Sequence, residues 1–223
     1  MEDIIRNAAK QLFEKPHKEV FPFIKKEKPQ KNDWFIVDIR KYCNGDFITW
    51  TGDGLNLKYV EQGDRIYYGV PFHILSQEKD KKTCIKIKSE LLSGYTNLEI
   101  PLEKKVKALF FLYTGYYAVP GDPGERKIIF EYEDGKKEEI SLIGGKNLFD
   151  WFPQKRYESE KIKYILVKTS ETIMPPYRNL YVLLWENPYP EKKINKIVFY
   201  SDGKGKRGIF VLGITGLLIK TSD

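Results

Sequence analysis

The sequence predicts an all-β protein, an antiparallel β-sandwich or jelly roll preceded by a short N-terminal helix. Apolar and polar residues alternate from residue 34 onward, and Gly, Asp, Asn and Pro separate the alternating segments. No helical pattern of ten residues interrupts this series, which disfavours parallel βαβ units. We therefore expect a helix and linker over residues 1–33 and one sandwich domain over residues 34–223.

The N-terminal segment has the pattern of an amphipathic helix. Between residues 3 and 14, apolar side chains recur at helical spacing, as at Ile4, Ala8 and Leu12. Residues 15–33 hold three prolines and many lysines, which indicates a linker packed along the body. No basic stretch followed by an apolar one is present, so we expect a cytoplasmic protein or a fragment of an exported one.

Short segments rich in Ile, Val, Phe and Tyr are the predicted strands. They span residues 34–39, 66–75, 83–88, 97–102, 107–114, 127–132, 137–142, 163–168, 180–186, 194–200 and 208–215. The turn Glu133-Asp-Gly-Lys136 between two of them is a strong hairpin signal. The pattern Gly203-x-Gly-x-x-Gly208 matches a dinucleotide-binding motif, but a predicted strand follows it instead of a helix, so we interpret it as a Gly-rich hairpin.

The composition excludes some functions and leaves others open. The net charge of +7 comes mostly from scattered lysines, which does not favour nucleic-acid binding, and no run of 18 apolar residues predicts a membrane span. A Lys- and Glu-rich, Gln-poor chain is typical of a thermophile. Cys43 and Cys84 lack metal-ligand spacing, so we expect two buried thiols, with a disulfide as the alternative.

The order of the strands places the loops at two ends of the sandwich, because consecutive strands run in opposite directions. One end receives residues 40–65, 89–96, 115–126, 143–162 and 187–193, which are long and rich in aromatic, amide and carboxylate groups. Such groups suit a sugar, although aromatic residues also form small cores within long loops. The predicted ligand-binding residues are Trp50, Asp53, Tyr116, Tyr117, Asp150, Trp151, Asn187 and Tyr189.

The corner Trp185-Glu-Asn-Pro-Tyr-Pro190 stands out at this end. Two prolines stiffen the turn, because each removes a backbone donor and restricts the residue before it. Trp185 continues the alternation of Tyr181 and Leu183, so we expect its ring in the core. Asn187 and Tyr189 lie beyond that anchor and are expected to border the binding end.

Several stretches together resemble a known family. They are Val37–Asn44, Tyr68–Leu75, Cys84–Ile87, Ala108–Tyr113, Ile129–Gly135, Asn147–Trp151 and Trp185–Pro190. In order and spacing they resemble the galactose-binding-like jelly-roll modules found beside glycosidase and other catalytic domains, over about residues 34–216. The resemblance implies a β-sandwich with a non-catalytic, usually carbohydrate-binding role. Tyr116 and Tyr117 depart from the family, whose members tend to carry His and Trp near this strand.

Two other functions stay open. One is a structural or protein-interaction domain that forms homo-oligomers through the aromatic end or the N-terminal helix. The other is a glycosidase, which needs paired carboxylates, and the candidates are Asp46, Asp53, Asp150 and Glu186. Loop carboxylates also suit a structural calcium ion, but no D-x-D-x-D spacing appears. We therefore expect a non-catalytic domain with no metal ligands and no cofactor.

Overall fold

The structure is a computed structural model, and it describes residues 20–47, 57, 59–152, 158–168 and 177–219. Its helical elements are α2 (Pro22–Glu27) and the 3-10 turns η1 (Lys31–Asp33) and η2 (Arg40–Tyr42). The strands are β1 (Trp34–Ile36), β2 (Gly63–Tyr67), β3 (Val70–Ile74), β4 (Ile85–Ile87), β5 (Asn97–Tyr116), β6 (Arg126–Tyr132), β7 (Lys137–Ser141), β8 (Ile162–Lys168), β9 (Tyr177–Glu186), β10 (Lys193–Ser201) and β11 (Gly208–Leu218). The predicted helix over residues 3–14 lies outside the described residues.

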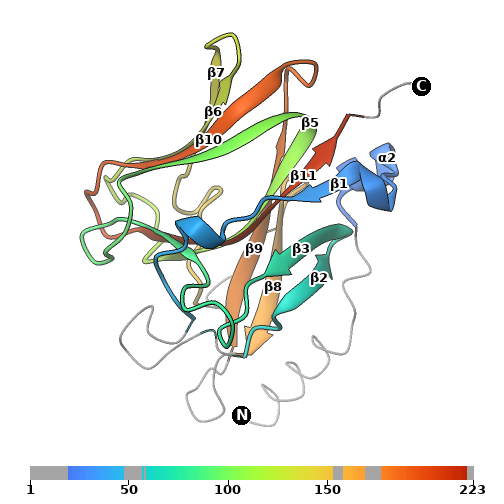
Figure 1. The fold of residues 1–223 in the computed structure, drawn as a ribbon. Helices are drawn as coiled ribbons and strands as arrows, with labels where there is room; N and C mark the ends of the chain where they lie inside the picture. Colours follow the sequence, from blue (N-terminus) through green and yellow to red (C-terminus); the bar gives the residue numbers. More distant parts are fainter. Residues whose placement is uncertain (1–19, 48–56, 58, 153–157, 169–176, 220–223) are drawn as a thin grey trace.

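The strands form two antiparallel layers joined by β5 (Figure 1). The first layer runs β8-β9-β5-β11, with β1 and β4 one after the other along the outer edge of β11. The second layer runs β5-β10-β6-β7. The predicted all-β, antiparallel sandwich is confirmed, and so is the hairpin at residues 133–136, which joins β6 to β7. The galactose-binding-like jelly roll stays a prediction.

The long strand β5 belongs to both layers. Residues 97–105 pair with β10, and residues 106–116 pair with β11. The prediction of two separate strands, 97–102 and 107–114, was therefore wrong. Glu103 adopts a positive φ of 53°, and the pairing register with β10 shifts between Ile194 and Lys196. Such irregularities bend a strand without ending it, so the chain turns from one sheet into the other.

The predicted strand 66–75 is instead part of the hairpin β2–β3. Tyr68 and Gly69, both with positive φ, form its two-residue turn. This turn could not be recognised in the sequence, because a tyrosine rarely adopts a positive φ. Here the Tyr68 side chain is tied down, since its hydroxyl donates to the carbonyl of Tyr164 and its ring packs edge-on against Phe21.

Two hydrophobic cores cover the two faces of the first sheet. Between the layers, Phe111 packs against Phe130, whose ring stacks on Trp185 at 3.6 Å. On the other face, Phe110 packs against Phe21 beside α2, and the β2–β3 hairpin contributes to the same core. Burial on both faces explains why β9 and β11 are continuous apolar runs. The predicted core position of Trp185 is confirmed.

The predicted sorting of loops into two ends fails after β7. Residues 142–152 lie beside the end of β5, through the bridge between Gly115 and Asp150. Lys161, however, lies at the other end, where its side chain pairs with Glu186. The chain therefore passes from one end to the other with no strand among the described residues of this connection, and the later loops that the structure describes, residues 187–192 and 202–207, lie at the ends opposite to those predicted. Among the described residues, no helix is long and apolar enough to span a membrane.

Candidate functional site

Four of the predicted ligand-binding residues, Tyr116, Tyr117, Asp150 and Trp151, come together at the end of β5. The Tyr116 and Tyr117 rings pack edge to face with centroids 4.8 Å apart, and Asp150 lies beside Gly115. Asp150 holds this turn, since its Oδ2 accepts the Ala118 N–H at 3.0 Å and its Oδ1 accepts the Phe152 N–H at 2.8 Å. Trp50 and Asp53 lie outside the described residues, so their predicted role stays a prediction.

Trp151 does not form the exposed patch that was expected around it. Its side chain is only 2% exposed, and the Arg178 guanidinium lies 5.1 Å from its ring centre. The ring is buried in the core on the outer face of the first sheet, so no face of it is free to stack on a sugar. This long loop needs an apolar anchor of its own, and Trp151 is that anchor. Tyr117 remains exposed, at 47%.

Asn187 and Tyr189 lie at the opposite end from Tyr117, which corrects their predicted place. The Asn187 side chain is buried, where its Oδ1 accepts the Tyr132 hydroxyl at 2.5 Å and its Nδ2 donates to the Val106 carbonyl at 2.9 Å. The Tyr189 ring packs edge-on against Tyr132. Both side chains therefore fix a corner of the sandwich, and Asn187 has no surface left for a ligand.

Asp150 and Glu186 do not form a glycosidase pair. Asp150 lies beside Gly115 and Glu186 lies opposite Ala108, seven residues away along β5. At about 3.3 Å per residue these backbone positions are more than about 20 Å apart, and a glycosidase needs carboxyl groups roughly 5 to 9.5 Å apart. Burial raises the pKa of Asp150, partly offset by its backbone hydrogen bonds. No three His, Cys, Asp or Glu side chains gather as a metal site in the described part of the chain.

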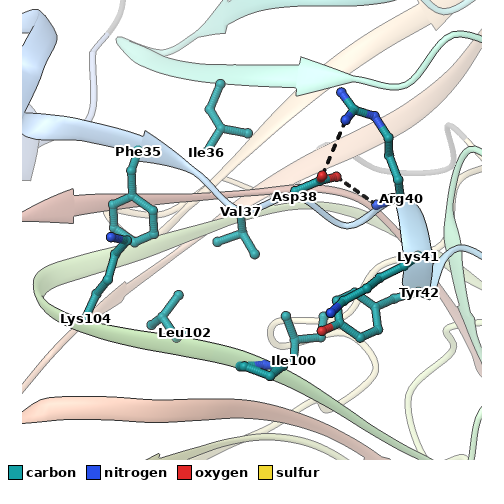
Figure 2. A pocket seen from close by; sticks show the side chains of 11 residues that line it. Phe35, Ile36, Val37, Asp38, Arg40, Lys41, Tyr42, Ile100, Leu102 and Lys104 are labelled. Atoms are coloured by element: carbon teal, nitrogen blue, oxygen red, sulfur yellow. Dashed lines mark hydrogen bonds and ion pairs between the residues drawn. The ribbon is translucent and has the colours of Figure 1, made fainter.

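A groove opens on one side of the sandwich, between β1 with η2 and the first half of β5 (Figure 2). We call it the β1–β5 groove, and it encloses about 460 Å³. Its floor consists of the buried side chains of Val37, Ile100 and Leu102. The half-buried rings of Phe35 and Tyr42 form its two end walls. The sandwich thus exposes part of its inner apolar surface here.

The rim of the β1–β5 groove is charged. Arg40 pairs with Asp38 at 3.3 Å, and both line the groove. The Lys104 ammonium lies 5.3 Å from the centre of the Phe35 ring, and the Lys41 ammonium lies 4.9 Å from the centre of the Tyr42 ring. Three cations and one carboxylate therefore surround an apolar floor.

Two sheet edges face each other across this groove. β1 ends the first sheet, and residues 97–105 of β5 pair with β10 only, so neither outer edge has a strand partner within the described ranges. Pro101 stands in the middle of the β5 edge and supplies no N–H. A proline at such a position protects an exposed edge from pairing with another chain.

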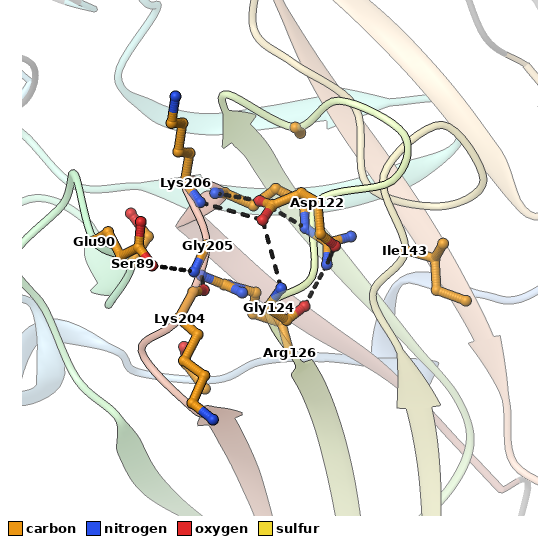
Figure 3. Close-up of polar contacts among 12 residues, drawn as sticks. Ser89, Glu90, Asp122, Gly124, Arg126, Ile143, Lys204, Gly205 and Lys206 are labelled. Atoms are coloured by element: carbon orange, nitrogen blue, oxygen red, sulfur yellow. Dashed lines mark hydrogen bonds and ion pairs between the residues drawn. The ribbon is translucent and has the colours of Figure 1, made fainter.

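A buried polar cluster joins three loops near the end that carries Tyr117 (Figure 3). The Asp122 carboxylate accepts the backbone N–H of Arg207 at 2.7 Å and pairs with its guanidinium at 3.1 Å. Glu90 accepts the N–H of Gly205 at 3.0 Å. Backbone N–H groups of the Gly-rich loop at residues 203–208 thus donate to carboxylates of the protein itself. This loop connects β10 of the second layer to β11 of the first layer, so it is not the predicted hairpin. Because a strand and not a helix follows it, it is not a dinucleotide-binding turn either.

Both cysteines are free, which confirms the predicted thiols and excludes the disulfide between Cys43 and Cys84 in this structure. Cys84 is buried and Cys43 is half-buried. Burial, reinforced by the negative charges of Asp80 and Asp38, raises the pKa of Cys43 to about 12. Neither thiol has the lowered pKa that a catalytic nucleophile requires.

The residues of the groove were missing from the predicted site. Phe35, Ile100 and Leu102 show only the ordinary alternation of strands in the sequence. Lys41 beside Tyr42 carried a weak signal, a cation next to an aromatic residue in a predicted loop. Their meeting depends on β5 belonging to both sheets, which strand periodicity does not reveal.

Comparisons with known proteins do not identify a relative. No family model matches the chain, and neither a curated protein nor a solved structure is significantly similar to it. The resemblance to galactose-binding-like modules therefore stays a prediction.

Proposed function

We propose that the protein is a non-catalytic carbohydrate-binding domain whose ligand lies in the β1–β5 groove. The observation that supports this most is the combination of an apolar floor with a charged rim at an open side of the sandwich. Aliphatic and aromatic side chains suit the C–H faces of a sugar, and the rim groups suit its hydroxyls. The volume of about 460 Å³ falls in the usual range for small-ligand sites.

The position of the site is tested with two tyrosines. Tyr42 lines the groove, and Tyr117 is the exposed tyrosine at the end of β5 where the sequence placed the ligand. A glycan array followed by calorimetric titration of the best binder would be run on the wild type, Tyr42→Ala and Tyr117→Ala. We expect Tyr42→Ala to weaken binding by about 1 kcal/mol, roughly fivefold, and Tyr117→Ala to leave it unchanged.

Two results would count against this proposal. Loss of binding in Tyr117→Ala alone would return the site to the end of β5. Absence of binding to every glycan by the folded wild type would remove the carbohydrate function itself. Circular dichroism of each variant checks that the fold is retained.

A protein-interaction domain is the second candidate, favoured by exposed apolar side chains near the end of β5. Tyr117, Val119, Ile143 and Phe152 are each between 36% and 48% exposed. Val119 and Ile143 are neighbours, since a Cβ at Gly144 would lie 2.2 Å from the Val119 carbonyl oxygen. Light scattering over a hundredfold range of concentration tests this function. A mass that rises in the wild type and not in Ile143→Glu would support it, and a constant monomer mass would exclude self-association.

A further inference from the structure

We infer that the β1–β5 groove selects acidic saccharides, whose carboxylate or sulfate groups bind Lys41 and Lys104. This inference rests on the proposed function, because it names the ligand class of the same groove. It follows from the charge of the rim, the positions of the two lysines and the nature of the β5 edge.

The charge of the rim is not balanced by the protein itself. Arg40 is engaged by Asp38 at 3.3 Å and lies 3.9 Å from Asp80. Lys41 and Lys104 make no ion pair with any carboxylate in the part of the chain that the structure describes. The two lysines therefore leave positive charge at the groove.

The acidic residues of β5 are already used elsewhere. Glu99 and Glu103, the acids nearest in sequence to Lys104, pair at 2.9 Å with Lys196 and Lys193 of β10. Sheet pairing thus directs these carboxylates away from the groove. An anionic ligand in the groove would therefore meet an ammonium group on Lys104 that no carboxylate of the described residues neutralises.

The lysines stand at the two ends of the groove, with the apolar floor between them (Figure 2). Each ammonium lies near an aromatic ring, Phe35 for Lys104 and Tyr42 for Lys41, and this contact favours a position at the groove. A ligand along the floor would meet a cation at each end. A linear saccharide with an acidic group on successive rings has this arrangement of C–H faces and charges.

The β5 edge favours a saccharide over an acidic polypeptide. A peptide that adds to a sheet edge gains affinity from backbone hydrogen bonds. Pro101 removes a donor from the middle of this edge. A saccharide does not need backbone hydrogen bonds along the β5 edge, because it binds through side chains of the floor and rim.

The test uses two forms of one ligand, oligogalacturonate and its methyl ester, which share the backbone and differ in charge. Calorimetric titrations would compare the wild type with Lys104→Gln and with Lys105→Gln, an adjacent exposed lysine that does not line the groove. We expect the wild type to bind the acid at least about threefold more tightly than the ester in low salt. We expect Lys104→Gln to remove most of that difference, Lys105→Gln to retain it, and added NaCl to reduce it.

The outcomes separate the inference from the proposed function. Equal affinity for acid and ester, with both weakened in Tyr42→Ala, overturns acid selectivity and leaves carbohydrate binding in the groove intact. Failure of the folded wild type to bind either form or any array glycan overturns both. Binding of a poly-glutamate peptide as tightly as the acid, with the same dependence on Lys104, overturns the saccharide class.

Discussion

Replacing Asn187 by alanine should destabilise the fold strongly, although the residue lies in a loop. Its amide satisfies the Tyr132 hydroxyl at 2.5 Å and the Val106 carbonyl at 2.9 Å, and both Asn187 and Tyr132 are buried. Each buried polar group left without a partner costs about 1–3 kcal/mol. The Tyr189 N–H, which also binds Asn187, is less buried and can bind water. We expect the free energy of unfolding to fall by about 3 kcal/mol.

Tyr132→Phe is the matched control, because it removes the hydroxyl and leaves the ring. It should cost about 1 kcal/mol, since the Asn187 oxygen keeps its bond to the Tyr189 N–H. In the double variant, Tyr132→Phe has already removed the hydroxyl that Asn187→Ala alone would leave without a partner. The two losses should therefore fall short of additivity by about 1 kcal/mol.

Urea unfolding followed by tryptophan fluorescence measures these changes, with Trp185 as a reporter two residues from Asn187. A cost below about 1 kcal/mol for Asn187→Ala, or additive effects of the two substitutions, would contradict this expectation. Either result would mean that water replaces the amide at this corner.

Three further outcomes are expected. Gly205→Ala should lower the free energy of unfolding by at least about 2 kcal/mol, because the glycine has a φ of +68° and a Cβ would lie 1.9 Å from Asp122 Oδ1. The control Gly135→Ala, at a glycine with a φ of +82° and open space around it, should cost only about 1 kcal/mol. Equal losses of unfolding free energy for the two variants in urea titrations would contradict a stabilising role for the contacts between Gly205 and Asp122. Cys43, with a pKa of about 12, should react negligibly with iodoacetamide at pH 8 and about tenfold faster for each unit of rising pH; rapid labelling of the folded protein would contradict this. Phe130→Leu should cost about 1–2 kcal/mol in thermal or urea unfolding by removing the stack on Trp185, and a neutral result would show that the stack adds nothing beyond burial.

Local features of the fold were predictable from the sequence. Strand positions followed from alternation, and Trp185 was placed in the core because it continued the period of Tyr181 and Leu183. The hairpin at residues 133–136 followed from Asp-Gly. The hairpin depends on the local backbone preferences of Asp-Gly, and the alternation depends on one buried face of each strand. Both can be recognised from a few neighbouring residues of the sequence.

The candidate site was less predictable, because it depends on connections. Periodicity carries no information on whether the chain crosses from one end of the sandwich to the other outside a strand, as the described residues on both sides of the 153–157 gap show it to do. That crossing put Asn187 at the opposite end from Tyr117. The polarity of Asn187 was a true signal, but it marked a buried hydrogen-bonding role.

For Trp151 too, the residue type did not distinguish a ligand-binding role from a structural one. An aromatic side chain in a long loop serves either a ligand or the loop's own core, and composition does not distinguish the two. The structure places this ring under the loop, against Arg178. Lys104 was overlooked for the opposite reason, since it fell in the charged segment between the predicted strands 97–102 and 107–114, where a lysine is ordinary until its carboxylate neighbours are found to pair elsewhere.

The central claim is that ligand binds in the β1–β5 groove, and the most direct test is to map binding by nuclear magnetic resonance. Backbone amide shifts of the isotopically labelled protein would be followed during titration with the tightest binder from the glycan array. Binding in the groove predicts that the largest shifts cluster at residues 35–42 and 100–104. Shifts centred on Tyr117 and Phe152, or none at saturating ligand, would contradict it.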